Sequence, residues 1–100
     1  MTIYAGEWKD RADIVCETEY GANIPTEDEL VYARYDSYNY EGDAIIVFVR
    51  DGVWYENNDG HCSCNGLDQW APEVTSPEAL LLRTKQVDLC AAVRARMESK

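Results

Sequence analysis

The chain has few basic residues and no long hydrophobic run. Nine Lys and Arg side chains accompany nineteen Asp and Glu, which gives a formal net charge of −10. A surface of this charge repels phosphate groups, so direct binding to nucleic acids or to anionic membranes is disfavoured. The longest dense apolar run, residues 44–49, has the length of a strand and falls far short of the roughly 20 residues that a transmembrane helix needs. The composition therefore predicts neither a nucleic-acid ligand nor a membrane span.

The N-terminal residues also lack a basic region followed by an apolar core, which is the pattern of an export signal. We therefore expect a cytoplasmic protein, in which thiols stay reduced. The four cysteines would still permit two disulfides in an exported protein, and this alternative stays open.

One hundred residues correspond to a single domain spanning residues 1–100. Hydrophobic residues make up 46% of the chain, and three Trp and seven Tyr are among them. This composition is typical of a folded globular domain and argues against disorder.

Two segments have helical patterns. Asp10–Glu19 predicts a short helix capped by Asp10, with Ala12, Val15 and Cys16 on its inner face and a stop at Gly21. Near the C-terminus, Thr75 is the expected cap of a long helix that continues to about Met97. The expected inner stripe of this helix comprises Leu82, Leu89, Val93 and Met97.

The middle of the chain has the pattern of a β-meander. Strands are expected at residues 30–36, 44–50 and 53–56, with Asp51-Gly52 as a two-residue hairpin turn. Residues 57–60 read as a second turn, before a short strand at 61–64. The sequence thus predicts an α+β fold, in which a three- to four-stranded antiparallel meander packs against a short N-terminal helix and a long C-terminal helix.

The segment around the only histidine concentrates potential metal ligands. His61, Cys62 and Cys64 could bind zinc if Cys16 or Cys90 supplied a fourth ligand. The spacing is not that of a common zinc motif, and the alternative is a pair of small, semi-buried thiols. Adjacent strand residues point to opposite faces, so His61 cannot activate Cys62 by a side-chain hydrogen bond. We therefore expect no enzymatic activity, and zinc is the one cofactor considered.

Aromatic and acidic residues gather in the predicted loop Ser37–Asp43. Tyr38, Tyr40, Glu41 and Asp43 would form a protein-binding face, because tyrosine provides a large contact area at low entropic cost. The alternatives are that Tyr32 and Tyr35 of the preceding strand only cover the sheet, with the loop pair alone exposed, and that the acidity only keeps the protein in solution.

Several short motifs resemble a group of small proteins encoded by bacteriophages and prophages. The resemblance covers about residues 40–83, and its most specific part is His61-Cys62-Ser63-Cys64-x-Gly66-Leu67, followed by Trp70-x-Pro72-Glu73. It implies a phage or mobile-element origin and action in the bacterial cytoplasm, and it assigns no catalytic or binding residue.

These observations together predict a small acidic phage accessory protein that binds a basic surface on a host protein. Such a protein would inhibit host defence or a nucleic-acid-binding enzyme. The alternative function is a zinc-stabilised structural or interaction module built on residues 61–64.

Overall fold

The computed structural model describes residues 2–38, 41–61 and 67–98 and has an α+β fold. The elements are β1 (Ile3–Gly6), α1 (Arg11–Glu17), the 3-10 turn η1 (Gly21–Asn23), β2 (Leu30–Tyr38), β3 (Glu41–Arg50), β4 (Val53–His61), β5 (Glu73–Thr75), α2 (Pro77–Leu81) and α3 (Val87–Glu98).

The strands form one sheet in the order β1-β2-β3-β4-β5. Strands β2, β3 and β4 are the predicted antiparallel meander, and β5 adds to it in the antiparallel direction. Strand β1 pairs with β2 in parallel. The expected antiparallel sheet of three to four strands is therefore a mixed sheet of five, because two strands of only four and three residues extend its edges.

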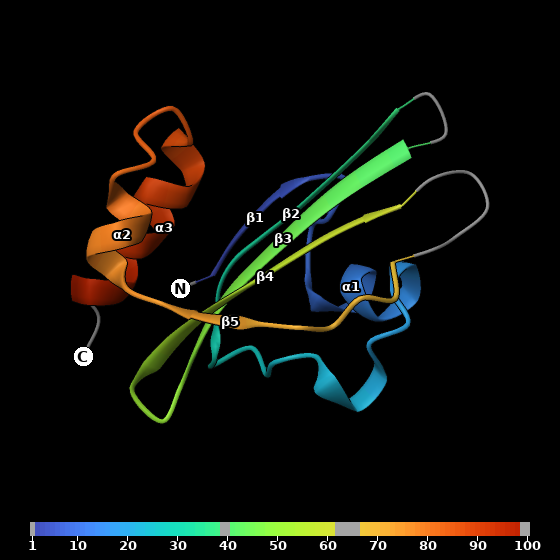
Figure 1. Cartoon of the computed structure of the whole chain (residues 1–100), viewed down its shortest axis with the longest axis horizontal. Helices are drawn as coiled ribbons and strands as arrows, with labels where there is room; N and C mark the ends of the chain where they lie inside the picture. The colour runs from blue at the N-terminus through green and yellow to red at the C-terminus, as the bar shows by residue number, and fades with distance from the viewer. Residues whose placement is uncertain (1, 39–40, 62–66, 99–100) are drawn as a thin grey trace.

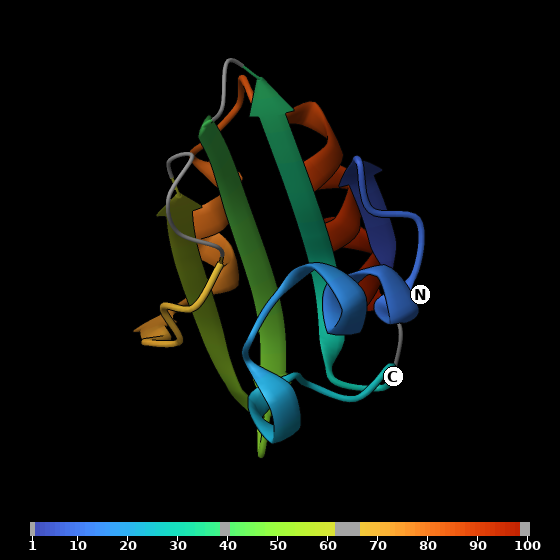
Figure 2. The same ribbon diagram turned by 90° about the vertical axis from the view of Figure 1, so that its right-hand side faces the viewer.

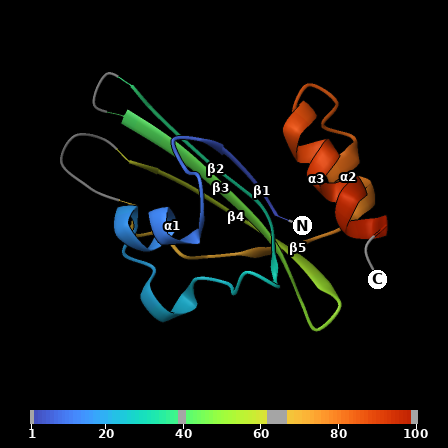
Figure 3. The ribbon, with the colours of Figure 1, turned by 180° about the vertical axis from the view of Figure 1, so that it is seen from behind.

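The sheet is the middle of three layers. Figure 2 shows α1 and η1 in front of the sheet and the pair α2 and α3 behind it, and the view from behind in Figure 3 shows the same separation. We call the two sides the α1 face and the α2–α3 face. The central strand β3 is apolar on both faces, as its sequence predicts, because layers cover it from both sides.

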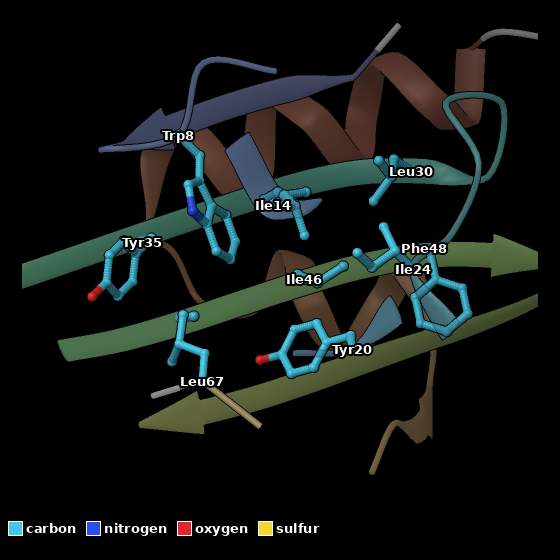
Figure 4. Packing of buried hydrophobic residues seen from close by; sticks show 11 residues of the cluster. Trp8, Ile14, Tyr20, Ile24, Leu30, Tyr35, Ile46, Phe48 and Leu67 are labelled. Atoms are coloured by element: carbon cyan, nitrogen blue, oxygen red, sulfur yellow. The ribbon is translucent and has the colours of Figure 1, made fainter. Parts of the chain in front are cut away.

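On the α1 face, the core combines aliphatic side chains with the rings of Trp8, Tyr20, Tyr35 and Phe48 (Figure 4). Phe48 stacks on Tyr55 and on Trp70, with ring centroids 5.1 and 5.6 Å apart. Trp8 stacks on Tyr35 in the same way at 5.5 Å. On the α2–α3 face the core is mainly aliphatic and comprises Val31, Tyr32, Val47, Leu80, Leu89, Ala92 and Val93.

Helix α1 begins at the predicted cap, since the Asp10 carboxylate accepts a hydrogen bond from the Asp13 N–H at 3.0 Å. Its predicted inner face is wrong. Ile14 is fully buried, whereas Val15 is 51% exposed and Ala12 and Cys16 are exposed. One large aliphatic side chain anchors this short helix, so its smaller apolar residues face outward.

The predicted long C-terminal helix is two helices. Ser76, rather than Thr75, caps α2, because Thr75 is the last residue of β5. Residues 82–86 interrupt the helix, and Leu82 in this interruption is 81% exposed. In α3, Met97 is 41% exposed, while Leu89 and Val93 are buried as expected. The break places Arg83 against the buried carboxylate of Glu56 at 2.5 and 2.7 Å. Among the described residues no helix is long and apolar enough to cross a membrane.

The hairpin turn at Asp51-Gly52 is confirmed, with φ of +54° and +79°. The predicted turn at residues 57–60 is wrong, because β4 continues through it to His61. Asn57 and Asp59 are polar residues typical of turns, yet here they are buried and hydrogen-bonded to other segments. Of the strand expected at residues 61–64, only His61 is described.

Candidate binding site at the end of the sheet

The predicted binding loop is mostly part of the β2–β3 hairpin. Tyr38 pairs with Glu41, Ser37 with Gly42 and Asp36 with Asp43, so the strands reach almost to the tip. Glu41 and Asp43 are exposed. Tyr40 lies outside the described residues, and for Tyr38 the structure describes only the backbone. The predicted loop is therefore the end of two paired strands. Of its four proposed binding residues, the structure describes the side chains of Glu41 and Asp43.

Two carboxylates face each other across this hairpin. Asp36 and Asp43 are direct cross-strand partners, so their side chains project on the same face of the sheet. Arg34 Nε lies 2.6 Å from Asp36 Oδ2, whereas Asp43 forms no ion pair with a described residue. Like charges directly opposite in a sheet are destabilising, so this pair lowers the stability of the hairpin.

Glu7 adds a further carboxylate at the same end of the sheet. It accepts hydrogen bonds from the Ser37 N–H at 2.7 Å and from the Ser37 hydroxyl. We call Glu7, Asp36, Glu41 and Asp43 the acidic end. With Arg34 as the adjacent guanidinium, four negative charges and one positive charge leave a net charge of −3.

Tyr35 lies beside this acidic end, on the α1 face. Burial raises the pKa of its hydroxyl, and the negative charges of Glu7 and Glu17 raise it further, while a hydrogen bond with Ser37 opposes them. The neighbouring carboxylates thus disfavour any additional negative charge here and favour a cation.

The α2–α3 face contains two hollows next to this end. One, of about 180 Å³, is lined by Arg34, Asp36, Asp43, Ala44, Ile45, Asn58, Arg83 and Gln86. The other, of about 270 Å³, is lined by Glu56, Asn58, Glu73, Val74, Thr75 and Arg83. Asn58 and Arg83 border both hollows, so the two form one polar region at the sheet edge.

A second pair of opposed carboxylates lies in this region. Glu56 pairs with Glu73 across β4 and β5. Burial raises the pKa of Glu56, but its hydrogen bonds with Arg83 and Asn58 outweigh burial, so the net pKa is lowered and the carboxylate stays charged. Glu73 is exposed and has no ion pair within the described ranges. In each pair an arginine binds one acid, and the other acid has no ion pair with the part of the chain that the structure describes.

On the α1 face, β4 holds the segment that follows Leu67. Asn57 Oδ1 accepts from the Ala71 N–H at 2.7 Å, and its amide donates to the Gln69 carbonyl at 3.2 Å. Asp59 accepts from the Tyr20 hydroxyl at 2.6 Å and from the Gln69 N–H at 3.0 Å. Burial and the Asp59 hydrogen bond raise the pKa of Tyr20. These hydrogen bonds use the side-chain polar groups of Asn57 and Asp59 within the chain, so these groups are not available to an outside ligand.

The proposed zinc ligands are largely outside the described residues. Cys62 and Cys64 lie there, His61 is described only as the backbone end of β4, and Cys16 is an exposed residue of α1. The described part of the chain contains no group of three or more side chains placed to hold a metal ion. The zinc hypothesis stays a prediction, which elemental analysis of the purified protein tests.

Asp36 and Glu7 are site residues that the sequence analysis missed. Asp36 is the last residue of a predicted strand, and its pairing with Asp43 requires both strands to extend into the predicted loop, one to Tyr38 and the other from Glu41. Glu7 has no local signal, because its contact with Ser37 depends on the parallel pairing of β1 with β2.

No protein-family model, curated protein or solved structure matches this chain.

Proposed function

We propose that this protein is a non-enzymatic binding protein whose acidic end docks on a basic surface of another protein. The observation that carries the proposal is the cross-strand pair Asp36 and Asp43, of which only Asp36 forms an ion pair with a described residue. A fold maintained for stability alone gains nothing from opposed carboxylates on an exposed hairpin. A destabilising arrangement of this kind is expected where a surface serves recognition.

The charge of the site also suits a binding role. A net charge of −3 concentrated at one end of the sheet accelerates the encounter with a basic partner and orients it. Tyr38 and Tyr40 adjoin Glu41 in the sequence, and we propose that they supply apolar contact area at the same interface.

The resemblance to phage and prophage proteins supports a partner in the bacterial cytoplasm. We propose a host protein with a basic surface, such as a defence protein or an enzyme that binds nucleic acid. An acidic protein that covers such a surface would compete with the phosphate backbone for the same basic residues.

The test is retention of proteins from a bacterial lysate at low and high salt. We expect the wild type to retain a partner at low salt and to release it at high salt, because screening weakens attraction between exposed charges. The double variant Glu41→Lys, Asp43→Lys should lose the partner.

The matched control is Asp28→Lys, Glu98→Lys, which changes the net charge equally at exposed positions outside the acidic end. It should retain the partner. Equal loss in both double variants would show that total charge, and not this site, governs binding, and no retention by the wild type would refute the proposal.

A further inference from the structure

Strand β4 is paired on both sides along only part of its length. It pairs with β3 from Val53 to His61, but with β5 only from Trp54 to Glu56. In Figure 1 β5 runs beside the first part of β4 and diverges from the later, yellow part. Beyond Glu56, no backbone in the described ranges pairs with the outer edge of β4.

The hairpin register determines which backbone groups face this edge. A two-residue turn closes on the hydrogen-bonded pair Arg50 and Val53, so every second pair from there exchanges hydrogen bonds within the hairpin. Asn57 and Asp59 therefore bond to β3, whereas Asn58 and Gly60 direct their N–H and C=O groups outward. The Gly60 N–H is bonded to the Asp59 carboxylate at 2.7 Å. The N–H and C=O of Asn58 form the centre of the open edge.

The side chain of Asn57 explains why β5 does not cover this edge. It holds Ala71 and Gln69 on the α1 face by the hydrogen bonds given above. The chain reaches the edge of β4 only at Glu73, which pairs with Glu56. The open edge thus follows from a specific buried contact.

We infer that an extended segment of the partner, with Lys or Arg at alternate positions, adds to the sheet along Asn58–Gly60. Unpaired strand edges are templates for such addition, in which backbone hydrogen bonds give affinity and alternate side chains give specificity. The inference deepens the proposed function, on which it rests, by stating how the basic partner binds.

Charge complementarity identifies the occupant. Asp43 is the cross-strand partner of Gly60, and a Cβ built on Gly60 would lie 3.3 Å from Asp43 Oδ1. Because Gly60 has no side chain, the Asp43 carboxylate is accessible over it from the edge. A basic side chain placed opposite Gly60 would reach Asp43, and one placed opposite Asn58 would lie next to Glu73. Asp43 and Glu73 are the members of the two opposed pairs that no described arginine neutralises.

The experiment compares Asn58→Pro with Asn58→Ala. Proline removes the outward N–H without breaking the β3–β4 ladder, since proline is tolerated where the N–H of an edge strand faces away from the sheet. Alanine keeps the N–H and removes the same side chain, including its hydrogen bond to Glu56 at 2.9 Å. Thermal unfolding and circular dichroism establish that each variant is folded.

The probe is a blocked ten-residue peptide of alternating Lys and Thr, titrated against the full chain at low salt. We expect binding to the wild type and to Asn58→Ala, and about tenfold weaker binding to Asn58→Pro, from the loss of one backbone hydrogen bond and the crowding of the edge. A peptide in which Glu replaces Lys should not bind.

Equal affinity of the two Asn58 variants would overturn strand addition, as would failure of the Lys peptide to bind the wild type. If Asn58→Pro instead abolished self-association of the chain, the edge would bind a second copy and the inference would be wrong. Should Asn58→Pro unfold, Gly60→Val replaces it, because a branched side chain there covers Asp43. The inference then requires weaker peptide binding by folded Gly60→Val.

These outcomes are distinguishable from failure of the proposed function. Loss of lysate partners in Glu41→Lys, Asp43→Lys, together with unchanged peptide binding in Asn58→Pro, would retain the acidic end as the site and exclude strand addition.

Discussion

The two halves of β4 differ in the strands that pair with them and in the contacts of their side chains. Trp54–Glu56 has a strand on each side, Tyr55 stacks on Phe48, and Glu56 is bonded to Arg83. Along Asn57–His61, β3 is the only strand of the described residues that pairs with it, and the buried side chains of Asn57 and Asp59 bond to a segment on the α1 face. A strand can therefore be held by side-chain hydrogen bonds on one face while its backbone edge stays available for a partner.

Removing the Asn57 side chain should lower the free energy of unfolding most, because it breaks the hydrogen bonds that hold the second half of β4 to the segment after Leu67. Asn57→Ala leaves the part-buried Ala71 N–H and Gln69 C=O without the Asn57 side chain as their partner, so we expect a loss of about 1–2 kcal/mol in unfolding free energy. Urea denaturation measures this loss. The control is Asn58→Ala on the exposed side of the same strand, and an equal loss there would contradict the account.

Tyr20→Phe should have the next largest effect. The variant keeps the ring beside Trp70 but removes the hydroxyl that donates to the buried Asp59 carboxylate. A hydrogen bond to a charged group of this kind contributes about 1.5 kcal/mol, and chemical denaturation would detect its loss. Tyr4→Phe is the matched control, because that hydroxyl donates to an exposed carboxylate, Glu27. A smaller loss in Tyr20→Phe than in Tyr4→Phe would show that Asp59 does not secure this half.

The contribution of the first half of β4 to stability should depend on pH through the carboxylate of Glu56. Its pKa is lowered in the folded state, so its contribution to stability is present above the ordinary value of 4.5 and disappears as the pH falls below it. We expect Glu56→Gln to lose about 1 kcal/mol at pH 7, since Arg83 is partly exposed.

Urea midpoints of wild type and Glu56→Gln should converge on acidification. Glu73→Gln, at the exposed partner position, serves as the control and should show no such loss at pH 7. A difference between wild type and Glu56→Gln that persisted unchanged in acid would exclude the ion pair with Arg83 as its origin.

Asp43→Asn should change the free energy of unfolding least, and the change should be an increase in stability. The substitution removes the negative charge opposite Asp36, and relief of a like-charge cross-strand pair is worth roughly 0.5 kcal/mol. Thermal unfolding at low salt should reveal the increase, which added salt should reduce. The same variant should bind the Lys peptide more weakly, and destabilisation at low salt would contradict the repulsion on which the proposed function rests.

Much of the fold could be predicted from the sequence where local pattern and tertiary context agree. The apolar faces of β3 and the Asp51-Gly52 turn follow from strand periodicity and turn chemistry alone. The second half of β4 was missed because Asn57-Asn58-Asp59-Gly60 is typical of a turn. Its strand conformation depends on Tyr20 and Ala71, which are distant in the sequence.

The break in the predicted C-terminal helix could not be predicted from the sequence for a related reason. Its periodicity is continuous, but the attraction of Arg83 to Glu56, 27 residues earlier, accompanies a break that periodicity cannot indicate. Of the site, Glu41 and Asp43 were predicted from local composition, whereas the opposition of Asp36 and the open edge at Asn58 depend on strand register.

Amide hydrogen exchange along β4 tests the account most directly. The Asn58 N–H should exchange much faster than the Glu56 N–H, which faces β5, and the Asn57 N–H, which bonds to β3. Binding of the Lys peptide should slow the exchange of the Asn58 N–H. Protection of the Asn58 amide equal to that of Glu56 in the unliganded protein would show that the edge is already occupied and would contradict the account.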